Sequence, residues 1–229
     1  MPKIYPQSVS ASIIKLVFGE NEFYLRQWAD IHFGHNKELM GTVIMTNPGS
    51  FHFERSVEWH ELPDSNGMLS STISSGSPDV TMQNIIHVIL KGYELAGLDS
   101  PNGVVHIRNL STIREPKAKK VTAAHTAIKE IMLQHHLDIS LLEDPTCRTK
   151  EGLDQLVQDS RFIILGFVKN MFTEEIMNIM KWKNQYSSKF VCSPLNHSNW
   201  CSHPFIWKIH KNYRHLAIEN LTDVLNKCQ

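Results

Sequence analysis

The sequence has few cysteines and no long apolar run. These two features argue against a disulfide-rich secreted protein and against a transmembrane protein. Four of 229 residues are cysteine, all in the second half of the chain. The longest apolar run, residues 162–168, is far shorter than the ~20 residues that a transmembrane helix needs. Residues 1–6 lack the apolar segment of a secretory signal peptide. We therefore expect an intracellular, cytoplasmic protein with free thiols and no transmembrane segment.

Neither sign of charge is in excess, since 23 basic residues face 23 acidic ones. This balance argues against a general polyanion binder, which usually carries a basic surplus. A local basic stretch could still contact phosphates of nucleic acid or lipid, although a solvated loop is the favoured interpretation. Its residues are Arg114, Lys117, Lys119 and Lys120. The 13 histidines could give a pH response, but surface histidines of no special role would give the same count.

Familiar catalytic motifs are also missing from the sequence. It contains no GxSxG elbow, P-loop, GxGxxG after a strand, HExxH or CxxC, and no internal repeat. Many enzymes assemble their sites from scattered residues, so these absences alone do not exclude catalysis. With an ordinary globular composition, they favour a non-catalytic structural or protein-interaction protein, an assembly or adaptor component that self-associates or binds a protein partner. Trp200, beside a loop rich in Cys and His, is a candidate partner anchor.

Strands are expected mainly in the first half of the chain. β-branched and apolar residues predict a strand at 10–18, and apolar spacings of three predict a short helix at 21–34. A second strand is expected at 39–46. Residues 51–59 alternate with a period of two that puts Phe51, Phe53 and Trp59 on one face and polar groups on the other, which is typical of a strand with one solvent-exposed face. Together these segments predict an antiparallel meander over residues 39–74.

Helices are expected mainly in the second half. Asp79 favours a helix ending near Gly97, and a strand is predicted at 104–113. The other predicted helices begin near Thr122, Thr149, Thr173 and Phe205. This order predicts an α+β fold, in which residues 1–145 form a mostly antiparallel sheet with one or two helices. Residues 146–229 would be a mainly helical part packed on that sheet, either as a second domain or as part of one continuous domain.

A zinc site is the first of two chemical hypotheses. Cys192, His197, Cys201 and His203 fall close together in a loop, and their sulfur and nitrogen atoms are the ligands that tetrahedral zinc prefers. Such an ion would make the protein a zinc-stabilised binding module. The spacing matches no common zinc finger, and small buried cysteines would explain the two Cys residues equally well.

A metal-dependent hydrolase of nuclease type is the second hypothesis. Pro78-Asp79 and Glu115-x-Lys117 satisfy a short pattern in which two carboxylates hold Mg²⁺ and a lysine assists the attacking water. Two features weaken it. Asp79 stands where a helix N-cap is expected, and Pro116 would interrupt a strand carrying Glu115 and Lys117. The pattern predicts that the three side chains meet in space.

Overall fold

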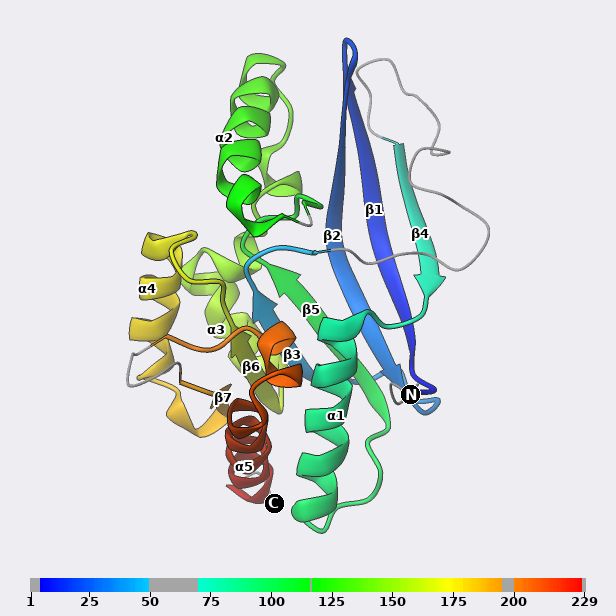
Figure 1. Ribbon diagram of the computed structural model, residues 1–229, viewed down its shortest axis with the longest axis vertical. Helices are drawn as coiled ribbons and strands as arrows, with labels where there is room; N and C mark the ends of the chain where they lie inside the picture. The colour runs from blue at the N-terminus through cyan, green and yellow to red at the C-terminus, as the bar shows by residue number, and fades with distance from the viewer. Residues whose placement is uncertain (1–4, 50–69, 116, 195–199, 228–229) are drawn as a thin grey trace.

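A seven-stranded mixed sheet organises the protein, with strand order β4-β1-β2-β5-β3-β6-β7 (Figure 1). The computed structural model describes residues 5–49, 70–115, 117–194 and 200–227. The antiparallel half contains β4, β1 and β2, and β2 pairs antiparallel with β5. Strands β5, β3, β6 and β7 run parallel to one another. The strands are β1 Ser8–Phe18, β2 Asn21–Phe33, β3 Leu39–Met45, β4 Ser70–Gly76, β5 Gly103–Asn109, β6 Phe162–Gly166 and β7 Phe190–Cys192.

A β-bulge explains why the helix expected at 21–34 is wrong. This segment is β2, which forms a hairpin with β1 through a turn at Gly19, where φ is +58°. Ser12 pairs with Trp28 but Ile13 pairs with Arg26, so Gln27 is an extra residue. An extra residue reverses which side chains face which side of the sheet. The apolar residues therefore do not alternate along β2, and their irregular spacing imitates a helix.

The predicted antiparallel meander over residues 39–74 is also wrong. Strand β3 lies inside the sheet, parallel to both β5 and β6, whereas β4 pairs with β1. Val43 and Ile44 are both fully buried, one on each face, as expected for a strand covered on both sides. The strand predicted at 51–59 lies outside the described residues.

Helices cover both faces of the sheet. In Figure 1, α1 and α5 lie side by side and form one core with the sheet. Helices α3 and α4 cover the opposite face, and α2 packs over the β1–β2 hairpin. The α-helices are α1 Val80–Leu95, α2 Ala118–Gln134, α3 Lys150–Asp159, α4 Thr173–Lys183 and α5 Lys211–Lys227. The 3-10 helices are η2 Ile139–Leu141, η3 Pro145–Cys147, η4 Ser187–Lys189 and η5 Pro204–Lys208.

The α+β class predicted from the sequence is confirmed, with most strands in the first half and most helices in the second. The predicted N-cap of α1 is present, because the side chain of Asp79 accepts a hydrogen bond from Met82 N. Thr149, near which another helix was predicted to begin, accepts one from Gly152 N. One sheet nevertheless joins both parts of the chain, since β6 and β7 lie beyond residue 145. Of the helices that the structure describes, none is both long and apolar enough to cross a bilayer.

Candidate functional site

A cavity of about 540 Å³ opens where the parallel strands end at their carboxyl termini. Segments that follow β3, β5, β6 and β7 contribute to its wall, and the N-terminus of α1 closes another side. Open sheets with parallel strands commonly bind ligands at this edge. We call it the strand-end cavity. Its lining is Arg26, Met45, Asn47, Pro48, Gly49, Asp79, Val80, Thr81, Met82, Gln83, Glu115, Val168, His203 and Phe205.

Hydrogen bonds join the segments that follow the neighbouring parallel strands β5, β3 and β6. The Asn47 side chain donates from Nδ2 to the carbonyl oxygen of Glu115 at 3.1 Å, which joins the segments following β3 and β5. The backbone nitrogen of Val168 donates to Thr46 Oγ1 at 2.8 Å, which joins those following β3 and β6. Because these contacts lie inside the protein, they hold one wall of the strand-end cavity in a single arrangement.

Arg26 brings a buried positive charge to the cavity. The bulge at Gln27 turns its side chain toward α1, and the residue is only 1% exposed. Burial lowers the pKa of Arg26 to about 10, although the Asp79 carboxylate opposes that shift. The guanidinium therefore remains charged at neutral pH, close enough to Asp79 for their charges to interact.

His203 contributes a neutral imidazole. Its Nδ1 accepts a hydrogen bond from the backbone nitrogen of Phe205 at 3.2 Å, so the ring proton of the neutral form lies on Nε2. Burial lowers the pKa of His203 to about 4. At neutral pH the ring is therefore uncharged, and its Nε2–H is a hydrogen-bond donor.

Close packing against Gly166 and α1 fixes the position of His203. A Cβ atom at Gly166 would overlap the Cδ atom of Pro204, so the end of β6 admits η5 only because this residue is glycine. The carbonyl oxygen of Pro204 accepts a hydrogen bond from Asn84 Nδ2 at 2.9 Å. The residue next to His203 is thus anchored both to the sheet and to α1.

The strand-end cavity contains two of the three residues in the nuclease pattern. Asp79 and Glu115 both line it, but Lys117 does not. Each carboxylate already accepts a backbone hydrogen bond, Asp79 from Met82 N at 2.9 Å and Glu115 from Lys117 N at 2.8 Å. Within the described parts of the chain, no three His, Cys, Asp or Glu side chains are grouped so that they could hold a metal ion.

The cysteines of the zinc hypothesis form a disulfide instead. Cys192 and Cys201 are bonded to each other, which corrects the expectation of free thiols and removes both thiolate ligands. His203 faces the strand-end cavity, and His197 lies outside the described residues. Cys147 remains a free, buried thiol. A covalent bond therefore holds the loop that zinc was expected to hold.

A second polar cluster resembles a hydrolytic triad but lacks access. His125 lies 2.8 Å from Ser111 Oγ through Nδ1 and 3.0 Å from Glu143 Oε1 through Nε2. Ser111 is fully buried, so a substrate could not reach its hydroxyl group. Lys129 and Arg148 surround Glu143. These contacts link α2 to the strand ends, and we interpret the cluster as structural.

Sequence reasoning did not identify Arg26 or Asn47 as site residues. A charged residue inside an apolar strand would have been a signal for Arg26, but the segment was interpreted as a helix. Asn47 follows the strand predicted at 39–46, and nothing in the local sequence marks it as a site residue. Comparisons with protein-family models, curated proteins and solved structures found no match for this chain.

Proposed function

We propose that this protein binds a small, polar heterocyclic compound of the nucleoside class in the strand-end cavity. The observation that carries the proposal is the convergence of Arg26, Asp79, Glu115 and His203 on one cavity at the ends of parallel strands. A volume of about 540 Å³ lies within the range of small-molecule sites, roughly 300–1,000 Å³. Convergent ionisable groups in such a cavity argue for ligand binding.

The walls of the cavity suit a planar ring with polar edges. Met45, Met82, Val168 and Phe205 supply apolar surface, and methionine side chains adapt well to flat ligands. Phe205 is 51% exposed, so its ring is available at the rim of the cavity. Carboxylates at Asp79 and Glu115 can accept hydrogen bonds from ring amino groups, and His203 can donate one.

The charges around the cavity favour a ligand with little net charge. Arg26 and the half-buried Arg114 oppose the carboxylates of Asp79 and Glu115, while His203 is neutral. A strongly anionic ligand would have to approach both carboxylates, which costs free energy in a partly buried site. An uncharged nucleoside therefore suits the balanced charges around the cavity better than a strongly anionic nucleoside triphosphate does.

Asn109 is a buried polar residue near the end of β5, and it does not line the cavity. It pairs with Met45 in the parallel β3–β5 ladder, so both side chains point toward the same face of the sheet. Asn109 is fully buried, and neither polar atom of its amide has a hydrogen-bond partner among the described residues.

The test is thermal stabilisation by adenosine, guanosine, cytidine and uridine. We expect at least one to raise the melting temperature, and Asp79→Asn to weaken that ligand about tenfold by removing one charged hydrogen bond. Asparagine caps helices as well as aspartate does, so the variant keeps the start of α1 intact. Asp138→Asn is the matched control, because Asp138 caps η2 at an exposed position.

Two results would rule out this function. One is the absence of stabilisation by all four nucleosides. The other is a nucleoside that raises the melting temperatures of Asp79→Asn and Glu115→Gln as much as it raises that of the Asp138→Asn control. Either would mean that these carboxylates do not contact a nucleoside.

The metal-dependent hydrolase is a second candidate, favoured by the position of Asp79 and Glu115 on one cavity. It requires Mn²⁺ or Mg²⁺ to bind between these carboxylates. In titration calorimetry we expect one Mn²⁺ ion per chain for the parent protein and about tenfold weaker binding for Asp79→Asn. Lys117→Gln should keep the ion, because Lys117 does not line the cavity. No Mn²⁺ binding by the parent protein would eliminate the candidate.

Protein interaction, the function first expected from the sequence, stays a prediction. Phe205 and Ile209 are large apolar side chains that are 51% and 70% exposed on and just after η5. They would be contact residues for a protein partner or a second copy. Nucleic-acid binding through the basic stretch at 114–120 likewise stays untested.

A further inference from the structure

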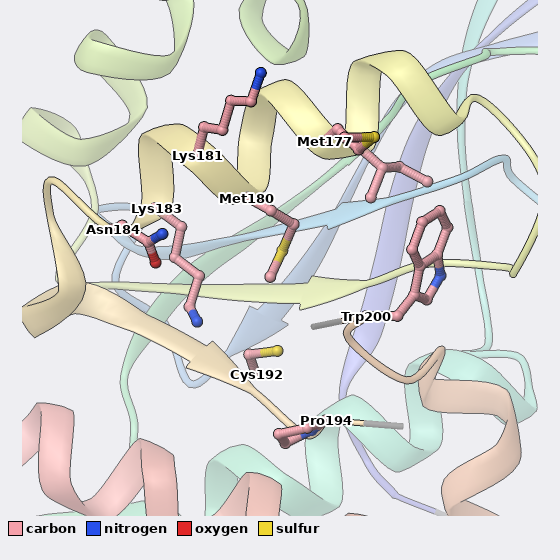
Figure 2. Close-up of a pocket in the computed structure, with 9 residues that line it drawn as sticks. Met177, Met180, Lys181, Lys183, Asn184, Cys192, Pro194 and Trp200 are labelled. Atoms are coloured by element: carbon pink, nitrogen blue, oxygen red, sulfur yellow. The ribbon is translucent and has the colours of Figure 1, made fainter. Parts of the chain in front are cut away.

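A second cavity, of about 420 Å³, lies between α4 and the disulfide-bonded loop (Figure 2). It is separate from the strand-end cavity, since the two have no lining residue in common. We call it the disulfide cavity. It is lined by Ile176, Met177, Met180, Lys181, Lys183, Asn184, Cys192, Pro194 and Trp200.

Apolar side chains form most of the disulfide cavity. Figure 2 shows Met177, Met180 and Trp200 around its interior, opposite Cys192 and Pro194. Cys201, the disulfide partner of Cys192, contacts the sulfur of Met180 at 3.7 Å. The disulfide therefore forms part of the wall and holds Cys192 and Cys201 together beside α4. A flexible thioether beside an indole ring favours an alkyl chain or another apolar body.

One cationic group points into this apolar space. Figure 2 shows Lys183 extending from the end of α4 toward Cys192, whereas Lys181 extends to the opposite side of the helix. Lys183 is half-buried, and burial lowers its pKa. No hydrogen bond or ion pair joins its ammonium group to any residue that the structure describes, and none of the described residues that line the cavity is acidic.

An anionic ligand would offset the unfavourable free energy of the partly buried Lys183 ammonium group. A partly buried ammonium group without a counter-ion is unfavourable, and a carboxylate at hydrogen-bond distance would restore the lost solvation. The same ligand must also fill the apolar space beside Met180 and Trp200. Charge complementarity and an apolar wall together specify a molecule with one acidic end and one hydrocarbon body.

We propose that the disulfide cavity binds a medium-chain fatty carboxylate, with the carboxylate at Lys183 and the alkyl chain against Met177, Met180 and Trp200. This site is independent of the proposed nucleoside site, because it uses another cavity on the opposite face of the sheet from α1.

Titration calorimetry with sodium decanoate tests the proposal. We expect the parent protein to bind one decanoate, and Lys183→Gln to weaken binding about tenfold through loss of one charge-assisted hydrogen bond. Lys227→Gln is the matched control, since it makes the same chemical change in the last turn of another helix, α5, at an exposed lysine that does not line the cavity. Lys183→Arg should retain binding because it keeps the positive charge.

Comparison with decanol separates charge recognition from simple apolar burial. Decanol has the same alkyl chain but no carboxylate. The parent protein should therefore bind decanol no more tightly than Lys183→Gln binds decanoate. Circular dichroism should show that both glutamine variants are folded. The proposal is overturned if decanoate does not bind, if decanol binds as tightly as decanoate, or if Lys183→Gln binds decanoate as tightly as Lys227→Gln does.

Discussion

Breaking the disulfide between Cys192 and Cys201 should lower the free energy of unfolding by about 2.5 kcal/mol. The bond closes a loop with a sequence separation of 9 residues, and chain-entropy arguments give about this value for so short a loop. For a chain of this size, the melting temperature should fall by about 5–10 °C. Thermal unfolding of the parent protein and of the double variant Cys192→Ser, Cys201→Ser measures the difference.

The reductant TCEP provides the control for this disulfide prediction. It should lower the melting temperature of the parent protein to nearly that of the double variant, and leave the double variant itself unchanged. Cys147→Ala tests whether the effect belongs to the disulfide, since Cys147 is a buried free thiol. This single variant should remain sensitive to TCEP. Equal melting temperatures for the parent and double variant would show that the bond does not constrain the loop.

Acidification should destabilise the protein through His203. The pKa of His203 is about 4 in the folded state, below the ordinary value of 6.5. Its contribution to stability is therefore complete above about pH 6.5, and is lost as the pH falls toward 4, because the unfolded chain binds the proton first. Between pH 7 and pH 5, urea unfolding should show a loss of about 2 kcal/mol from this residue.

The variant His203→Asn isolates this contribution. Asparagine can still accept the hydrogen bond from Phe205 N, so the start of η5 is preserved without a titratable ring. His125 also has a lowered pKa, through burial, and gives both proteins a common acid sensitivity. The cavity also contains Arg26, Asp79 and Glu115, which are the same in the parent and in the variant. If the parent and variant lose equal stability between pH 7 and pH 5, His203 does not titrate as the structure indicates.

Periodicity predicted the regular elements of the fold and missed the irregular one. Helix α1 follows directly from its apolar spacing and from the Asp79 cap, and β1 from its β-branched residues. In β2 the bulge at Gln27 changes the face of every later side chain, which places Leu25 and Ala29 in cores on opposite faces. A period of two interrupted by one residue cannot be distinguished from a period of three by spacing alone.

In the candidate site, too, a local sequence pattern predicted some of the residues, whereas others are brought together only by the tertiary structure. Asp79 and Glu115 were selected from a short pattern, and they do lie on one cavity. Arg26 and His203 reach that cavity from β2 and from the segment after β7, which are far apart in the chain. The spacing of residues along the chain does not predict that these side chains meet, because their meeting depends on the order of the strands in the sheet.

The sequence by itself determined the α+β class, the positions of most helices and the caps of α1 and α3, because these depend on contacts within a few residues. Only the tertiary structure decided that β3 is parallel to β5 and β6, that Cys192 bonds to Cys201 and that four strand ends share one cavity. The physical reason is that strand pairing and disulfide bonding join residues distant in sequence. Their free energy depends on how the whole chain packs, and local composition does not encode it.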